Sequence, residues 1–202
     1  MPRPPSTLRN ELLKEARKVL LQEGYPGLTM RRIAKAVGCT PTSIYLYFRN
    51  KDALVHELID EGMGILHDQL VEATAGVEDT TERLYWYARA YIDFALQNPE
   101  YYEVMFLLRS DMERYPAELY RRARHNLEII AEALATQSGE RDPVELLTAT
   151  SVLWSLVHGS VTILLAKRLD YKIDREVFCD RVARHAALLA RDAVRPDLDF
   201  GK

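Results

Sequence analysis

Residues 39–51, C-T-P-T-S-I-Y-L-Y-F-R-N-K, bring many hydrogen-bonding side chains together within one short segment. The hydroxyls and phenols belong to Thr40, Thr42, Ser43, Tyr45 and Tyr47. In a helix, Ile44 and Phe48 lie four residues apart and share one buried face, which leaves the polar side chains pointing outward. Outward-facing hydroxyls on rigid arms suit hydrogen bonds to an external polar surface, such as phosphates or base edges.

Two short helices are expected to position these side chains. The first begins after the N-cap residue Thr29 and runs to about Val37, and Gly38 then supplies the positive φ of a tight turn. Thr40 caps the second helix, with Pro41 at its first position. This pattern predicts a helix-turn-helix, whose second helix lies in the major groove of DNA.

The charge of the chain is divided unevenly. Residues 1–51 contain ten Lys and Arg against three Asp and Glu, whereas the whole chain has a net charge of -3. The remaining residues, 52–202, are therefore acidic. A basic N-terminal part on an acidic remainder is expected when the N-terminal part alone meets a polyanion.

The rest of the chain also has helical periodicity, so we expect an all-α protein of about nine helices. It would consist of a three-helix DNA-binding domain at 1–51 and a larger helical bundle at 52–202. The helices are expected at 6–24, 29–37, from 41, from 51, 80–97, 99–108, 116–139, 143–169 and from 174.

Residues 146–166 contain no charged side chain and are long enough to span a membrane. They also contain several Ser and Thr residues, which favours a helix that is buried on all sides in a soluble protein. In a chain of this size, such burial suggests a homodimer built from the helices at 143–169 and 174–194. The candidate interface residues are Val161, Leu165, Phe178 and Val182.

Residues 28–54 resemble the DNA-binding domain of the TetR family of bacterial transcriptional repressors. The matching positions are Thr29, Ile33, Ala34, Gly38, Ile44, Tyr45, Phe48, Lys51, Asp52 and Leu54. The segments 94–106, F-A-L-Q-N-P-E-Y-Y-E-V-M-F, and 154–159, W-S-L-V-H-G, resemble the C-terminal domain of one subgroup of that family.

The resemblance implies a cytoplasmic homodimer that binds pseudo-palindromic operator DNA and represses transcription until a small ligand binds the C-terminal domain. It implies that Thr29 and Lys51 hold phosphates and that Arg31 contacts a base. The remaining DNA-binding candidates are Thr40, Pro41, Thr42, Ser43, Tyr45 and Tyr47. Thr42 occupies a position that is often glycine in the family, and Arg32 replaces a frequent acid.

A ligand site is expected in the C-terminal part, because aromatic residues gather there around one histidine. The candidates are Tyr87, Tyr91, Phe94, Met105, Trp154 and His158. Mostly apolar walls with few polar groups are typical of small-molecule pockets. The alternative interpretation is that Trp154 and His158, four residues apart, form an ordinary core contact.

Other classes of function find less support in the sequence. His158 with Ser151 or Ser155 lacks an acid on the same helix to orient the base, so no catalytic residues, metal site or cofactor are expected. A DNA-binding protein without a ligand, such as an architectural protein, stays an alternative. Cys39 and Cys179 are interpreted as free thiols.

Overall fold

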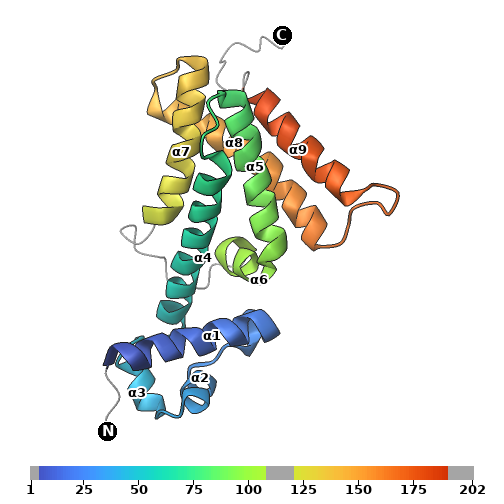
Figure 1. The fold of residues 1–202 in the computed structure, drawn as a ribbon. Helices are drawn as coiled ribbons and strands as arrows, with labels where there is room; N and C mark the ends of the chain where they lie inside the picture. Colours follow the sequence, from blue (N-terminus) through green and yellow to red (C-terminus); the bar gives the residue numbers. More distant parts are fainter. Residues whose placement is uncertain (1–4, 108–120, 191–202) are drawn as a thin grey trace, which may run out of the picture. The chain divides into compact units, whose positions relative to one another are not determined.

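The computed structural model describes residues 5–107 and 121–190, and Figure 1 shows that these residues form helices and connecting turns. The helices are α1 Pro5–Gly27, α2 Met30–Val37, α3 Pro41–Tyr45, α4 Lys51–Thr74, α5 Thr80–Gln97, α6 Pro99–Tyr102, the π-helix η1 Glu103–Leu107, α7 Arg121–Ser138, α8 Pro143–Leu165 and α9 Arg175–Leu189. The all-α prediction is therefore confirmed.

The chain divides into two compact units. The head comprises the described residues 5–64 and 98–107, and the body comprises 65–97 and 121–190. The division falls inside α4, so this helix contributes its first part to the head and its last part to the body. The expected functional boundary at residue 51 stays a prediction.

The boundaries of the helices in the head follow from local hydrogen bonds. Gly24 interrupts α1 with a φ of 67°, where the sequence predicted its end. The hydroxyl of Thr29 accepts a hydrogen bond from the backbone N–H of Arg32 at 3.3 Å. Gly38 ends α2 with a φ of 73°, a left-handed conformation that glycine adopts without steric cost. The predicted caps of α2 are thus confirmed.

The next two helices of the head begin in the same way. The Thr40 hydroxyl accepts a hydrogen bond from the backbone N–H of Ser43 at 3.1 Å, and Pro41 occupies the first position of α3. The side-chain carbonyl of Asn50 accepts one from the backbone N–H of Ala53 at 2.8 Å, which begins α4. Each cap satisfies an N–H group that the helix itself leaves without a partner.

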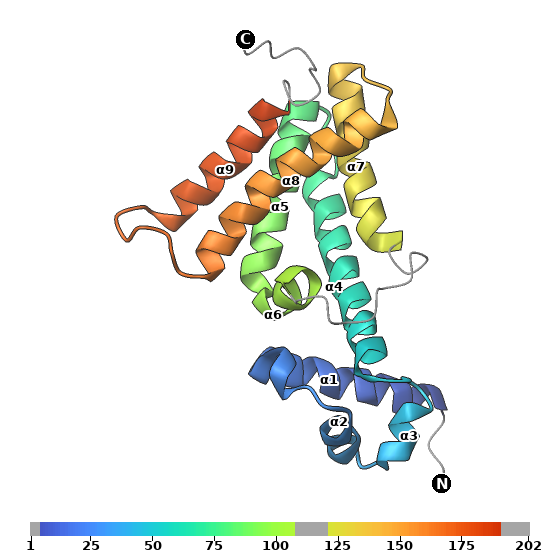
Figure 2. The ribbon, with the colours of Figure 1, turned by 180° about the vertical axis from the view of Figure 1, so that it is seen from behind.

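The core of the head joins α1, α2, α3 and the first part of α4. Its central side chains are Leu12, Ala16, Leu20, Ile33, Ile44, Phe48, Leu54 and Leu58. In Figures 1 and 2, α2 and α3 lie on the same side of α1, and apolar side chains of all three helices belong to one buried cluster.

A segment from later in the chain completes this core. Val104 of η1 belongs to the same apolar cluster as the side chains of α1 and α4. The Tyr101 hydroxyl donates a hydrogen bond to Glu61 at 3.0 Å, and Arg17 of α1 pairs with the same carboxylate. A Cβ atom at Gly62 would lie only 2.6 Å from Met105 Sδ, so α4 and η1 pack closely at this glycine.

In the body, α5 contacts α7, α8 and α9. Polar contacts join α5 to α9. Arg89 of α5 binds Glu176 of α9 as well as Asp93 of its own helix. The Tyr85 hydroxyl of α5 donates a hydrogen bond to Asp180 of α9 at 2.9 Å. Figure 2 shows α8 and α9 as neighbours joined by a loop. Asp174 caps α9 by accepting a hydrogen bond from the backbone N–H of Val177.

The end of α8 differs from the prediction, because the helix stops at Leu165 instead of about Leu169. Lys167 takes a left-handed conformation with a φ of 55°. Its N–H donates to the Leu164 carbonyl, and the N–H of Arg168 donates to the Ile163 carbonyl, each at 3.0 Å. This is the Schellman arrangement, which usually employs glycine, so a lysine gave no sequence signal.

The helix expected at 116–139 corresponds to α7, and the beginning of the expected range lies outside the described residues. Within the described residues, α8 is the one helix long and apolar enough to cross a membrane. Length and composition are weak evidence for that, since core helices of soluble proteins have the same properties.

Candidate nucleic-acid interface and ligand site

The outer face of α3 and the turn that follows it carries four exposed side chains. They are Thr42, Tyr45 and Leu46, at the i, i+3 and i+4 spacing of one helical face, and Arg49 in the bend that follows. Ile44 and Phe48 on the opposite face are buried in the head core. The turn thus presents a hydroxyl, a phenol and an apolar side chain on one side, and an exposed guanidinium follows it in the chain.

The structure separates the two tyrosines that the sequence placed on one outer face. Tyr45 is half exposed, whereas Tyr47 is partly buried and packs against the head core. Tyr45 is the last residue of α3, whereas Tyr47 lies in the turn that follows, where the chain leaves the helix. Pro41, exposed like Thr42, lies at the N-terminal end of the same surface.

Two of the candidate hydroxyls have a structural task. The Oγ1 atom of Thr40 caps α3 and lies 2.8 Å from the Oγ atom of Ser43. Thr29 caps α2 through its own Oγ1 atom. These contacts fix the beginnings of both helices and hence the angle of the turn between them, which sets the direction of the exposed face.

The cations of the head are of two kinds. Arg31 is exposed at the first turn of α2, next to the Thr29 cap. Arg32 instead forms an ion pair with Glu23, and the bond from its guanidinium holds the pKa of that carboxyl below its usual value. Arg32 therefore has an acidic partner within the head despite replacing the family's usual acid.

Lys51, predicted to bind a phosphate, contacts other parts of the head through its ammonium group. Its ammonium donates a hydrogen bond to the Tyr25 carbonyl at 3.0 Å and lies 3.5 Å from the centre of the Tyr25 ring. Burial lowers the pKa of this ammonium. We call this contact the Lys51–Tyr25 clasp. It joins the start of α4 to the last turn of α1, just before Thr29.

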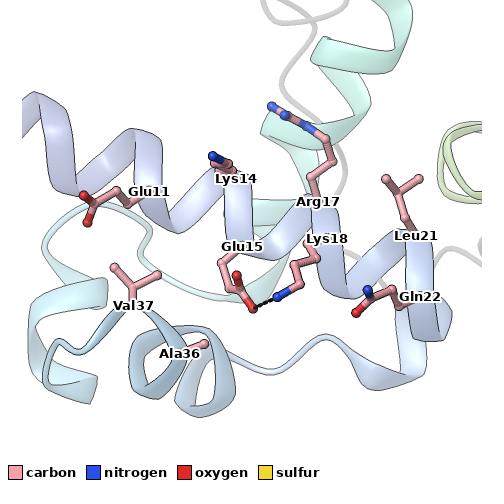
Figure 3. Close-up of a pocket in the computed structure, with 9 residues that line it drawn as sticks. All are labelled: Glu11, Lys14, Glu15, Arg17, Lys18, Leu21, Gln22, Ala36 and Val37. Carbon is pink, nitrogen blue, oxygen red and sulfur yellow. Dashed lines mark ion pairs between the residues drawn. The ribbon is translucent and has the colours of Figure 1, made fainter.

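An open groove of about 590 Å³ lies between α1 and the end of α2 (Figure 3). Charged side chains of α1 line much of it, and among them Lys18 pairs with Glu15 at 3.7 Å. Leu21 and Val37 add a small apolar part. The charged lining is typical of a hydrated surface and differs from the apolar walls of small-molecule sites.

In the body, three of the candidate ligand residues form a connected cluster. The Trp154 Nε1–H donates to the Tyr91 hydroxyl at 3.2 Å, and that oxygen lies 2.9 Å from His158 Nδ1. The rings of Trp154 and His158 are 4.5 Å apart between centres. Burial lowers the pKa of His158, which favours its neutral form at neutral pH. The cluster joins α5 to α8.

The remaining ligand candidates occupy different places. Tyr87 and Phe94 are buried side chains of α5 in the body, whereas Met105 belongs to the head, where it packs against Gly62. A groove of about 290 Å³ in the body is lined by other residues of α4 and α5, among them Gln69 and Trp86. None of the six candidates lines that groove.

The four interface candidates are buried to different degrees. Val161 has no exposed surface and Val182 very little, so both are buried within the body. Leu165 and Phe178 are half-buried. The exposed apolar side chains of α8 and α9 are instead Val144, Leu147, Val152, Ile163, Val177, Leu188 and Leu189.

Comparison with known families agrees with this geometry. Residues 12–58, which span α1 to the first turns of α4, match the family model described as bacterial regulatory proteins of the tetR family. Residues 84–186, about half of the chain, match the tetracyclin repressor-like C-terminal domain. The chain belongs to the TetR family of transcriptional regulators.

Individual relatives place this TetR-family regulator among bacterial proteins. It is 28% identical over 156 residues to the uncharacterized HTH-type transcriptional regulator YobS of Bacillus subtilis, covering 77% of this chain and 78% of that protein. It is 31% identical over 87 residues to the HTH-type transcriptional repressor AcnR of Corynebacterium glutamicum, covering 41% and 46% of the two chains.

A solved structure also shares the fold of this TetR-family regulator. A protein of unknown function from Rhodococcus sp. RHA1 superimposes with a TM-score of 0.74 and 22% identity, over 92% of this chain and 94% of that one. At this identity, the similarity concerns the fold. The family assignment itself rests on the two domain matches, one to the helix-turn-helix and the other to most of the body.

Proposed function

We propose that this TetR-family regulator binds a pseudo-palindromic operator as a homodimer and represses transcription until a small, mostly apolar effector releases it. It acts in the cytoplasm by binding alone, without a catalytic step or cofactor. The observation that carries the proposal is the exposed face of α3, held by capped helices within a head whose first 51 residues are strongly basic.

The DNA contacts follow from the chemistry of the exposed side chains. Thr42 and Tyr45 offer hydroxyls to base edges, and Arg31 offers a guanidinium that can bind guanine with two hydrogen bonds. The start of α2, at Thr29, directs backbone N–H groups outward and suits a phosphate. We propose that Lys51 supports these contacts by holding the turn before Thr29 in place through the Lys51–Tyr25 clasp.

Gel-shift titration with the DNA upstream of the protein's own gene tests operator binding. We expect one discrete complex that survives an excess of unrelated DNA, and a binding constant that falls steeply with salt concentration. A smear that unrelated DNA competes away would favour the architectural alternative. Arg31→Ala should weaken the discrete complex, whereas Arg32→Ala, which removes a cation already paired within the head, should weaken it less.

The homodimer is supported by the exposed apolar side chains of α8. Val152 and Ile163 are 11 residues apart, close to three helical turns, and Val144 lies nearer the start of the helix, with Ser and Thr residues between them. The hydroxyls of Thr148, Ser151 and Ser155 donate hydrogen bonds to the backbone carbonyls four residues earlier. Because these O–H groups already have acceptors within the helix, burying them in an interface costs little. We propose that this face, with Val177 and Leu188 of α9, packs against a second copy as a four-helix bundle.

Sedimentation velocity at micromolar concentration tests the dimer, and a single monomeric species would contradict it. A dimer with two-fold symmetry would carry two α3 helices to half-sites about one helical turn, roughly 34 Å, apart. The operator should then be pseudo-palindromic with that spacing. A protected footprint of only one half-site would contradict the symmetric arrangement.

The effector site is proposed around the Tyr91–Trp154–His158 cluster. Its aromatic rings offer apolar walls, and its hydrogen-bond chain holds the neutral imidazole in one orientation. The chain itself links body and head, because α4 belongs to both and α5 is followed directly by α6. An effector can lower DNA affinity only by favouring a conformation that binds DNA less well.

A thermal-shift screen with aromatic and aliphatic small molecules, followed by release from DNA, tests the effector site. Trp154→Ala and His158→Ala should bind DNA normally and lose the response to the effector. Trp86→Ala, which removes an exposed tryptophan of the same unit, is the matched control and should keep it. If both cluster variants unfold or fail to dimerise, the cluster is an ordinary core contact.

A further inference from the structure

Leu46 is the most exposed large apolar side chain in the described part of the head, with 81% of its surface accessible. It lies directly after α3, where the backbone N–H groups of Tyr47 and Phe48 both donate to the Ile44 carbonyl at 3.0 Å. The helical turn thus continues past Tyr45. Leu46 is therefore held at a defined position on the outer face, beside Thr42 and Tyr45.

Folding of the head does not require a leucine at this position. Ile44 and Phe48 already fill the core side of the turn, with 0% and 2% of their surfaces exposed. Rotation of the Leu46 side chain into the core would displace one of them. Single exposed leucines are common on protein surfaces, so exposure alone has little meaning. The neighbouring side chains make this exposure informative, because Thr42 and Tyr45, on the same face of the turn, both bear hydrogen-bonding groups.

The edges of base pairs in the major groove are polar with one exception. Thymine presents a C5 methyl group there, beside acceptors and donors that hydroxyls and guanidinium groups recognise. For a leucine that lies among polar side chains on the DNA face, the thymine methyl group is therefore the one apolar partner in the major groove. We infer that Leu46 contacts the methyl group of a thymine in each half-site of the operator and so determines sequence preference at that base pair, an inference that rests on the proposed operator binding.

The size of the effect follows from the area that the contact buries. Removal of one methyl-sized group from water corresponds to about a fourfold change in a binding constant. A symmetric dimer makes the contact twice, so loss of both methyl groups should weaken binding about fifteenfold. Deoxyuridine lacks only this methyl group and keeps the base pair, so it isolates the contact.

The experiment begins with an operator selected from a random DNA library by the full-length protein. Each thymine is then replaced, symmetrically in both half-sites, by deoxyuridine, and the dissociation constants of wild type and Leu46→Ala are measured. One position is expected where deoxyuridine weakens wild-type binding about fifteenfold and leaves Leu46→Ala unaffected. Leu46→Ala should bind the thymine operator about as weakly as wild type binds the deoxyuridine operator, or more weakly.

Two controls keep the result specific. Leu21→Ala shortens an exposed leucine on α1 of the same unit and should keep the wild-type sensitivity to deoxyuridine. Equal melting temperatures of wild type and Leu46→Ala exclude a folding defect. The inference is overturned if no thymine is sensitive in the wild type, or if Leu46→Ala retains the sensitivity. A library that yields no preferred sequence would instead overturn the proposed operator binding, and the two failures are thus distinguishable.

Discussion

The head and the body of this regulator differ in how many large apolar side chains they expose to solvent. In the described part of the head, the exposed large apolar side chains are Leu21, Tyr45 and Leu46, and two of these lie on the proposed DNA face. The body exposes more of them, and several lie on α8 and α9. The head is therefore nearly complete by itself as a folded unit, whereas the body leaves an apolar surface to be covered.

The two units also differ in the helices that carry their proposed surfaces. In the head, the DNA face lies on α3, a short helix that depends on its side-chain cap and on the shared core. In the body, the exposed apolar side chains lie on the long helices α8 and α9, and α9 is joined to α5 by ion pairs such as Arg89–Glu176. The comparison indicates that perturbing the head changes stability and DNA contacts, whereas perturbing the exposed face of the body changes association.

The largest effect is expected at the exposed face of α8. Val152→Glu would place a charge within the proposed dimer interface and should give a monomer, because an unpaired buried charge costs several kcal/mol. DNA affinity should fall about 100-fold or more, since the two heads no longer bind as one molecule. Sedimentation velocity and gel shift measure both effects.

Val71→Glu is the matched control for this change. Val71 of α4 is 49% exposed, close to the 59% of Val152, and it belongs to the same unit. The variant should remain dimeric and bind DNA normally. If both glutamate variants behave alike, the face of α8 is no more important than any other exposed surface of the body.

A second, smaller effect is expected in the head at Gly62. The added Cβ atom of Gly62→Ala would lie 2.6 Å from Met105 Sδ and 2.9 Å from Tyr101 Cδ1. Overpacking costs about 1–3 kcal/mol, and the better helix propensity of alanine recovers up to about 1 kcal/mol. Urea unfolding should show a net loss of about 1–2 kcal/mol. Unchanged stability would mean that the segment 98–107 is not closely packed against α4.

The Lys51–Tyr25 clasp should contribute less. Lys51→Met keeps a long side chain but removes the hydrogen bond and the cation–π contact, so stability should fall by about 1 kcal/mol. DNA binding should weaken while the slope of its salt dependence stays unchanged. A slope lower by about one unit, with an unchanged melting temperature, would instead identify Lys51 as a direct phosphate ligand.

The smallest effect concerns pH. The bond from Arg89 lowers the pKa of Glu176, so this pair stabilises the fold above the ordinary glutamate pKa of 4.5 and loses its effect as the pH falls through the lower folded-state pKa. Glu176→Gln should therefore melt below wild type at neutral pH. The difference should shrink in acid. Glu23→Gln tests the equivalent pair with Arg32 in the head, and a difference independent of pH would contradict either assignment.

The sequence predicted those features that depend on neighbouring residues. The caps at Thr29 and Thr40 were both confirmed, because a cap is formed within three residues of the helix start. The left-handed turn at Gly38 was confirmed for the same reason. Whether the exposed side chains of α3 bind DNA stays a prediction, as do the effector site and the dimer.

The sequence could not predict features that depend on distant parts of the chain. The apolar pattern of α8 continues around most of the helix, so periodicity could not distinguish Val161, which faces the core of the body, from Val152, which is exposed. Nothing in residues 98–107 indicated that Val104 would enter the core of the head. The π-helix η1 likewise has no known signature among these residues.

The contribution of Val104, Tyr101 and Met105 to the head has an evolutionary consequence. A gene fusion that joined the first 64 residues of one family member to the rest of another would separate α1 and Gly62 from the side chains that pack on them. Recombination within this lineage should therefore succeed only when the coding region for residues 98–107 travels with the helix-turn-helix. The head is thus encoded by two separate stretches of sequence, residues 5–64 and 98–107 of the described chain, whose side chains pack on each other.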